Sequence, residues 1–145
     1  MVAYTFINHV KLFVDGGCRG NPGPGAVGVL VLNATGNDEL DLQATCIGTT
    51  TCNGAEYRAV IMGLNVCARY TRGRVTCFTD SKLVVNHMSC AWRLKNDALR
   101  ELYLKVKQCE QFFDEVVYTH VGRNNSYIKR VDRALNEAFE GRLTA

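Results

Sequence analysis

The hydrophobic pattern of this chain changes its period part-way along, and that change restricts the folds open to it. Residues 10–15, 26–34 and 39–48 are apolar or alternating runs separated by turn-forming residues, a pattern typical of β-strands. From residue 53 onward, helical and strand-like runs alternate. Strands joined by short turns form an antiparallel meander, whereas strands joined by helices continue in parallel. The sequence therefore predicts one mixed α/β sheet with helices on both faces.

Apolar residues at helical spacing identify the helices of the second part, and strand-like runs separate them. The expected helices cover residues 53–70, 81–90, 96–112 and 127–141, and the remaining strands cover residues 74–80 and 115–121. Asn53 is the candidate N-cap of the first helix. The residues expected on the inward helix faces are Ala55, Ala59, Met62 and Val66, then Leu99, Leu102, Tyr103 and Val106, and finally Ile128, Val131, Leu135 and Ala138. The predicted order is β-β-β-α-β-α-α-β-α, and since no linker interrupts it we expect one domain over residues 1–145.

The composition limits the class of protein. The net charge of +3 is compatible with a nucleic-acid partner, although many other proteins are as basic. The seven cysteines are odd in number, spread along the chain and without a C-x-x-C pair, which favours reduced thiols over a disulfide framework or a zinc site. Reduced thiols, with no signal-peptide pattern and no apolar run approaching ~20 residues, predict a soluble cytoplasmic protein.

Four acidic residues stand at positions where a sheet of this kind binds ligands. Asp15 and Asp80 each end an apolar strand, and open α/β sheets bind ligands beyond their strand ends. Glu56 is expected in the first helical turn after the third strand, and Asp132 borders the apolar stripe of the last helix. If the four side chains converge, their repulsion calls for a divalent cation. Carboxylates without His or Cys select Mg²⁺ or Mn²⁺ over zinc, and two such ions ~4 Å apart suit displacement at phosphorus.

Each acid also has a purely structural explanation. Glu56 and Asp80 could cap helices or face the positive end of a helix dipole. Asp132 could pair with Lys129 on the surface of the last helix. Asp15 is harder to explain in this way, because it precedes Gly-Gly and has no helix to cap.

Four segments together resemble a known family. VDGGCRGNPGPGAVGV, TTTCNGAEYRAV, CFTDSKLVV and VDRALNEA are similar, in order and spacing, to the signature segments of type 1 ribonuclease H over about residues 10–140. The resemblance implies the ribonuclease H-like fold, a five-stranded mixed sheet. It implies that Asp15, Glu56, Asp80 and Asp132 are both the catalytic residues and the ligands of two Mg²⁺ ions, for which Mn²⁺ can substitute. The activity it implies is endonucleolytic cleavage of the RNA strand in an RNA/DNA hybrid, leaving 5′-phosphate and 3′-hydroxyl ends.

The resemblance also implies a substrate surface. The turn after Asp15, rich in glycine and proline, keeps side chains away so that the RNA backbone can approach. Thr51 is assigned to a phosphate of the DNA strand, whereas Asn21 and Asn53 either contact the RNA minor groove or belong to ordinary turns. The full set of implied substrate contacts is Gly16, Cys18, Arg19, Gly20, Asn21, Thr51, Cys52, Asn53, Lys82, Trp92, Arg123 and Asn124.

The chain departs from the family pattern in its basic residues. The lysine-rich protrusion that many relatives carry after the tryptophan is missing, and only Arg93 and Lys95 remain near Trp92. Hybrid binding is therefore expected to be weaker than in relatives with the protrusion, and strongly sensitive to salt. Trp92 either stacks in the DNA groove or fills the core.

The loop before the last helix and two contact positions also differ from the family pattern. The loop has no His where well-studied members carry one. His120 lies just upstream as an expected packed strand residue, Asn124 or Asn125 is the nearer match, and Arg123 is the candidate for contacting the scissile phosphate. Cys52 and Lys82 stand where asparagine and glutamine are common, so cleavage of double-stranded RNA stays open.

Two other functions are alternatives to the ribonuclease H activity that the resemblance implies. One is a weak or inactive nucleic-acid-binding module of the same fold, which the presence of all four acids disfavours. The other is a 3′ exonuclease or strand-transfer enzyme, which the order of the acids and the GNPGPG loop disfavour. We expect a monomer with no hybrid-binding module, no membrane contact, and an RNA/DNA hybrid as its partner.

Overall fold

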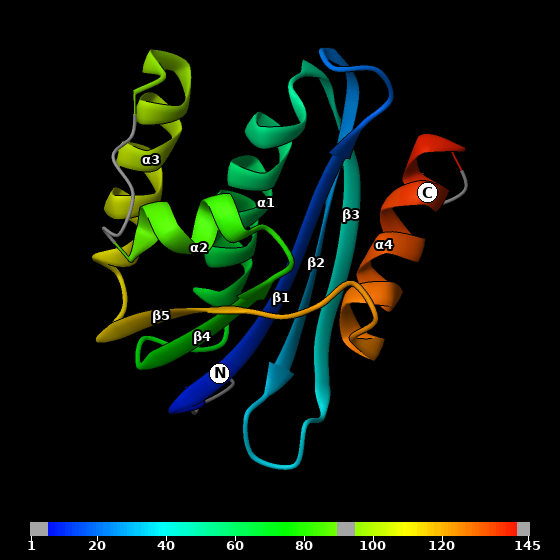
Figure 1. Cartoon of the computed structure of the whole chain (residues 1–145). Helices are drawn as coiled ribbons and strands as arrows, with labels where there is room; N and C mark the ends of the chain where they lie inside the picture. Colours follow the sequence, from blue (N-terminus) through cyan, green and yellow to red (C-terminus); the bar gives the residue numbers. More distant parts are fainter. Residues whose placement is uncertain (1–5, 90–94, 142–145) are drawn as a thin grey trace.

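The structure is a computed structural model that describes residues 6–89 and 95–141 (Figure 1). The strands are β1 (His9–Cys18), β2 (Gly23–Asn33), β3 (Glu39–Thr50), β4 (Arg74–Thr79) and β5 (Glu115–His120). The helices are α1 (Cys52–Cys67), α2 (Lys82–Met88), α3 (Asp97–Glu110) and α4 (Ser126–Phe139). The order of elements is the predicted one.

The five strands form a single mixed sheet in the order β3-β2-β1-β4-β5. β1 pairs antiparallel with β2, and β2 with β3, whereas β1 pairs parallel with β4, and β4 with β5. The predicted meander with a parallel continuation is therefore confirmed. β1 is the central strand, and it belongs to both parts of the sheet.

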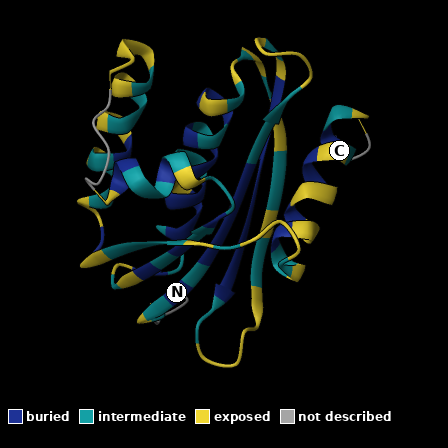
Figure 2. Ribbon diagram, viewed as in Figure 1, coloured by how far each residue is buried: buried dark blue, intermediate teal, exposed yellow. Residues whose placement is uncertain are grey.

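Helices cover both faces of the sheet: α1, α2 and α3 lie on one side and α4 on the other (Figure 1). Alternate residues of β1 divide between the two cores, because successive side chains of a strand point to opposite faces. Val10, Leu12 and Val14 pack in the cluster that includes α1. Phe13 packs with Ile128 and Val131 of α4. Figure 2 shows this buried centre, with exposed residues on β3, the outer helix faces and the turns.

The inward helix faces are largely those that the spacing predicted. In α4 the buried residues are Ile128, Val131, Ala134, Leu135 and Ala138. Ala55, Ala59 and Val66 of α1 are buried, and Met62 is half-buried. In α3 only Val106 is buried, and its other predicted inward residues are half-buried against the core.

Close packing seats α4 on the sheet. A Cβ added at Gly28 of β2 would lie 2.8 Å from Cγ1 of Val131. The missing side chain at Gly28 therefore lets the helix that carries Asp132 approach the centre of the sheet.

The first helix begins earlier than predicted. Its N-cap is Thr51 rather than Asn53, and the Thr51 hydroxyl oxygen accepts a hydrogen bond from the Gly54 amide at 3.0 Å. Glu56 therefore lies in the second turn and not the first. Ser81, rather than Asp80, is the N-cap of α2. The helix-capping explanations of Glu56 and Asp80 are wrong.

Asp15 does not end its strand, because β1 continues to Cys18 along β2. The parallel pairing with β4 does stop at Phe13 and Phe78. Asp15 therefore lies two residues after Phe13, and Asp80 lies two residues after Phe78, its partner in the last parallel pair. Both lie where the central strand leaves its parallel neighbour.

The cysteines contradict one prediction. Cys18 and Cys52 form a disulfide, so the expectation of reduced thiols is wrong for this pair and the inference of a reducing compartment loses that support. The periodicity and spacing of the sequence did not show that the end of β1 meets the start of α1. Among the described residues, Cys46, Cys67, Cys77 and Cys109 are free.

Some predictions concern residues outside the description. Trp92 and Arg93 lie outside the described residues, so base stacking or core filling by Trp92 stays a prediction.

His120 belongs to β5 as expected but is exposed rather than packed. Within residues 6–89 and 95–141, none of the helices combines the length and hydrophobicity needed to cross a membrane.

Candidate active site

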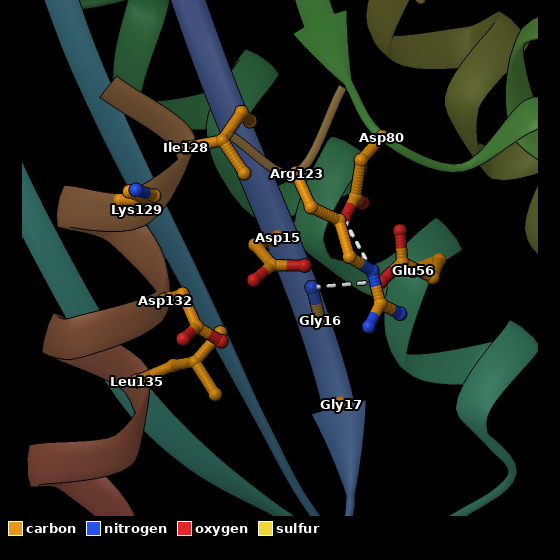
Figure 3. A pocket seen from close by; sticks show the side chains of 10 residues that line it. All are labelled: Asp15, Gly16, Gly17, Glu56, Asp80, Arg123, Ile128, Lys129, Asp132 and Leu135. Carbon is orange, nitrogen blue, oxygen red and sulfur yellow. Dashed lines mark hydrogen bonds and ion pairs between the residues drawn. The ribbon is translucent and has the colours of Figure 1, made fainter. Parts of the chain in front are cut away.

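Three of the four predicted acids meet at the end of the parallel pairing. Asp15 comes from β1, Glu56 from α1 and Asp80 from the residue after β4. One carboxylate oxygen of each lies within 4.8 Å of the other two. Asp132 of α4 faces the same cavity from the opposite wall (Figure 3).

The cavity is small and mixed in character. Its volume is about 230 Å³. Its lining consists of Asp15, Gly16, Gly17, Glu56, Asp80, Arg123, Ile128, Lys129, Asp132 and Leu135. The structure thus brings all four acids to one place, while their catalytic and metal-binding roles remain proposals.

One carboxylate oxygen of Glu56 accepts a hydrogen bond, and the other is available to bind a cation. The Gly16 amide donates to its Oε1 at 3.1 Å. Its Oε2 is buried, and the residues that the structure describes donate no hydrogen bond to it. Gly16 suits this contact because a Cβ there would collide with the Ala55 carbonyl. A buried carboxylate oxygen without a donor is costly, and a bound cation would satisfy it.

The electrostatics of the metal-free cluster are unfavourable. Burial, and then the negative charges of Asp80 and Asp132, raise the pKa of Asp15 from 3.8 to about 7. Burial, and then Asp15 and Asp80, raise the pKa of Glu56 well above its ordinary value, although the Gly16 amide opposes this rise. An all-oxygen donor set under such repulsion fits a hard divalent cation such as Mg²⁺ or Mn²⁺.

Arg123 reaches over the rim of the cavity. Its Nε lies 3.3 Å from Oδ2 of Asp80, and its side chain is 92% exposed while that of Asp80 is 11% exposed. An ion pair with such an exposed partner contributes roughly 0–1 kcal/mol. Asp80 therefore holds Arg123 only weakly.

Lys129 is a cavity residue that the sequence predicted only as a surface partner of Asp132. It lines the cavity together with Asp132, and the described ion pairs do not include one between them. Asp132 instead accepts a hydrogen bond from Asn136 at 3.3 Å. The i,i+3 spacing to Asp132 was the available signal for Lys129, since it puts both on one helix face.

Several predicted substrate contacts gather in a neighbouring groove. Asn21, Thr51 and Asn53 line a groove of about 370 Å³ that α3 closes from the other side. Oδ1 of Asn21 also accepts a hydrogen bond from the Cys52 amide at 3.1 Å. These residues of two different segments therefore belong to one surface.

The remaining predicted contacts are more dispersed. Arg19 is exposed, and its guanidinium lies 4.5 Å from the ring centroid of Phe139. Gly20 has a φ of +90°, which explains a glycine in this turn. Lys82 and Asn124 are exposed, and neither lines either of these two cavities.

Comparison with known proteins extends over nearly the whole chain. The model of the family described as reverse transcriptase-like matches residues 13–128. A ribonuclease H of Hydrogenovibrio crunogenus is 34% identical over 148 residues, covering 92% of this chain and 97% of that protein. The chain belongs to the type 1 ribonuclease H family. The resemblance in the four signature segments is thereby confirmed.

Solved structures of this ribonuclease H family share the fold. The RNase H1 of Halobacterium salinarum has a TM-score of 0.86 at 31% identity, covering 92% of this chain and 98% of that one. LC11-RNase H1, solved in complex with an RNA/DNA hybrid, has a TM-score of 0.84 at 29% identity, covering 93% and 99%.

Some ribonuclease H relatives are longer proteins. A bifunctional protein of Mycobacterium tuberculosis is 36% identical over 132 residues, which are 90% of this chain but 35% of that protein. This chain therefore spans about a third of that relative's length.

Proposed function

We propose that this chain is an endoribonuclease that hydrolyses the RNA strand of RNA/DNA hybrids. The observation that carries the proposal is the meeting of Asp15, Glu56 and Asp80 within 4.8 Å in a chain of this family. The solved complex of LC11-RNase H1 with an RNA/DNA hybrid supports the choice of substrate. Double-stranded RNA is a second candidate substrate, because Cys52 and Lys82 depart from the family pattern.

Two Mg²⁺ ions are the proposed cofactor, with Mn²⁺ able to substitute. Asp15, Glu56 and Asp80 would hold them, with Asp132 completing the set from α4. The buried Oε2 of Glu56, to which the described residues donate no hydrogen bond, and the raised pKa of Asp15 support this assignment. Bound ions would supply activation of the attacking water and stabilisation of the leaving oxygen, giving 5′-phosphate and 3′-hydroxyl ends.

The residues around the acids bind and orient the substrate. Arg123 and Lys129 place positive charge beside the cavity, where they attract the scissile phosphate. Gly16 and Gly17 line the cavity without side chains, so the RNA backbone can approach the carboxylates.

Thr51 is well placed for a phosphate of the DNA strand. Its hydroxyl oxygen accepts the Gly54 amide, which leaves the hydroxyl hydrogen free to be donated to a phosphate oxygen. It also stands at the N-terminus of α1, where the helix dipole favours an anion.

Hydrolysis of a labelled RNA/DNA hybrid tests the proposal. We expect the wild type to cut internally with Mg²⁺ or Mn²⁺, and Asp80→Asn to be inactive. Asp114→Asn is a matched control, because Asp114 is an exposed acid outside the cavity. Equal cutting by wild type and Asp80→Asn, or none by wild type at any metal concentration, would overturn the proposal, and the second result would favour a nucleic-acid-binding module.

The products and the substrate range separate the other candidates. Stepwise release of mononucleotides from an internally labelled hybrid would indicate an exonuclease instead. RNA/RNA and DNA/DNA duplexes, tested under the same conditions, measure the selectivity for the hybrid.

A further inference from the structure

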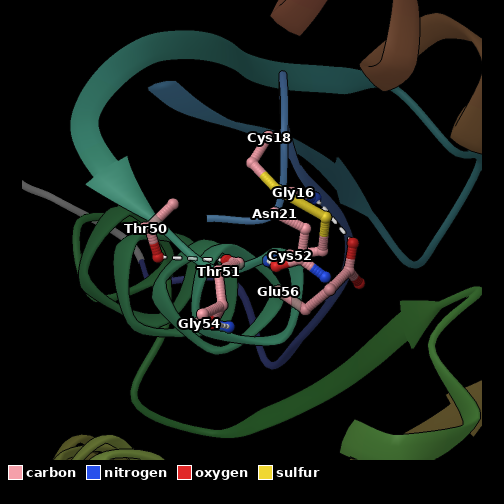
Figure 4. Close-up of a disulfide and its surroundings, with 8 residues drawn as sticks. All are labelled: Gly16, Cys18, Asn21, Thr50, Thr51, Cys52, Gly54 and Glu56. Carbon is pink, nitrogen blue, oxygen red and sulfur yellow. Dashed lines mark hydrogen bonds between the residues drawn. A yellow bond between two sulfur atoms is a disulfide. The ribbon is translucent and has the colours of Figure 1, made fainter. Parts of the chain in front are cut away.

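A disulfide joins the two segments that carry Asp15 and Glu56 (Figure 4). Cys18 ends β1, three residues after Asp15, and Cys52 begins α1, one helical turn before Glu56. The two cysteines are 34 residues apart in the sequence. The covalent bond therefore closes the junction between the central strand and the first helix, beside the cluster of acids.

Other contacts hold the inner part of the same junction. The Gly16 amide donates to Glu56, and the backbone of β1 at Gly16 lies against the Ala55 carbonyl. These contacts lie between the disulfide and the acids, and they do not depend on sulfur. Opening the disulfide should leave the carboxylate cluster in place.

The outer part of the junction depends more on the disulfide. The turn between β1 and β2 is exposed from Arg19 to Pro22. The only hydrogen bond that the described residues show from this turn to α1 is the one from the Cys52 amide to Asn21. It involves one of the bridged cysteines. The disulfide therefore restrains the part of the turn that carries the proposed RNA contacts.

Both sulfur-bearing residues are accessible. Cys18 and Cys52 are half-buried rather than enclosed, in contrast to the buried free cysteines Cys67 and Cys77. A small dithiol can attack one sulfur and form a mixed disulfide, and its second thiol then closes a ring and leaves. In the overall reaction the dithiol is oxidised to a cyclic disulfide, and its two hydrogens pass to Cys18 and Cys52.

We propose that the Cys18–Cys52 disulfide is a redox-sensitive positioning element that sets the affinity for the hybrid. With the bond closed, the turn is held against the start of α1 in the form that binds RNA. Reduction by a dithiol releases the turn, which must then be ordered again on binding, and this weakens affinity. The inference rests on the proposed substrate, since it concerns the same surface.

The expected effect falls on binding more than on chemistry. Ordering one or two additional side chains lowers affinity on the order of 5-fold. The Gly16–Glu56 contact survives reduction, so kcat should change much less than KM. A general loss of folding would lower both.

The experiment compares the protein prepared without reductant with the same protein after dithiol treatment. Thiol titration in denaturant should find two more thiols after treatment than before it, because Cys18 and Cys52 are released. Hybrid binding is measured in an Asp80→Asn background with Mg²⁺, and KM and kcat in the wild type. Cys18→Ser/Cys52→Ser should not respond to the dithiol, whereas the matched control Cys46→Ser/Cys109→Ser should respond like the wild type.

The outcomes separate this inference from the proposed function. Seven thiols before treatment, or equal hybrid affinity in both states, would overturn the inference even if the protein cleaves hybrids. A redox-dependent affinity without cleavage in either state would overturn the proposed function and leave the inference standing. Because the wild type is tested in both states, the result does not require the double variant to fold.

Discussion

Replacement of Asp15 by Asn should stabilise the metal-free protein at pH 8 while it abolishes hybrid cleavage. Asp15 is only 8% exposed. Its pKa is raised from 3.8 to about 7 by burial and by the charges of Asp80 and Asp132. At pH 8 the wild type must therefore keep a buried charge beside two others. The amide of asparagine has a similar shape and no charge.

The magnitude follows from the difference in pKa between the folded and unfolded states. A rise from 3.8 to about 7 corresponds to about 4 kcal/mol at about 1.4 kcal/mol per unit. Because the neighbouring acids adjust and the new amide needs partners, we expect a gain of about 2–4 kcal/mol in the free energy of unfolding.

The sign of the pH dependence is also fixed. The folded pKa of Asp15 lies above the unfolded one, so protonated Asp15 contributes its full stability below about pH 4. That contribution is lost as the pH rises through about 7. The wild type should therefore lose stability between about pH 4 and pH 7, and Asp15→Asn should lose less. The two stabilities should converge in acid.

Urea unfolding in EDTA between pH 4 and pH 8 measures this difference. Asp114→Asn serves as the control for removal of an exposed acid. If Asp15→Asn is no more stable than the wild type at pH 8, the electrostatic account of the site is wrong. A gain that persists undiminished at pH 4 would mean that the stabilisation does not come from the charge of Asp15.

Three further results are expected. Millimolar Mg²⁺ should raise the melting temperature of the wild type at neutral pH, because an ion that binds only the folded state stabilises that state. The rise should be smaller in Asp15→Asn. Equal rises in both proteins would show that the ion binds elsewhere. Gly28→Ala should lower the free energy of unfolding by about 1–3 kcal/mol in urea, because the new Cβ would meet Val131 Cγ1 at 2.8 Å; an unchanged midpoint would show that α4 can move. Arg123→Ala should reduce hybrid cleavage but change stability by less than about 1 kcal/mol, since its side chain is 92% exposed; undiminished cleavage would remove Arg123 from the substrate contacts.

The fold could be predicted because its signal is local. The change from strand-like to helical periodicity is present in each run, and the rule that helix-linked strands run parallel supplies the topology. Asp15 and Asp80 could be located for the same reason, since each directly follows an apolar run. Periodicity also placed Glu56 and Asp132 on helices as candidate acids, and the family resemblance joined all four acids into one metal-binding set.

The errors concern contacts that depend on tertiary structure. Thr51 and Asn53 are both suitable N-caps. Which of them caps α1 depends on which side chain reaches a backbone amide of the first turn. The pairing of Cys18 with Cys52 follows from the meeting of a strand end and a helix start, which cysteine spacing alone cannot reveal. Lys129 is exposed but lines the cavity, because α4 forms the wall that also carries Asp132.

The packing of α4 on Gly28 has a consequence for folding of the chain during its synthesis on the ribosome. The trio of Asp15, Glu56 and Asp80 belongs to elements that are translated before α4, whereas Asp132 arrives with α4, the last helix in the described chain. A nascent chain can thus bring Asp15, Glu56 and Asp80 together while α4, which forms one wall of the cavity, is still inside the ribosomal exit tunnel. The proposed hydrolysis should therefore begin only after that helix has emerged and docked on the sheet.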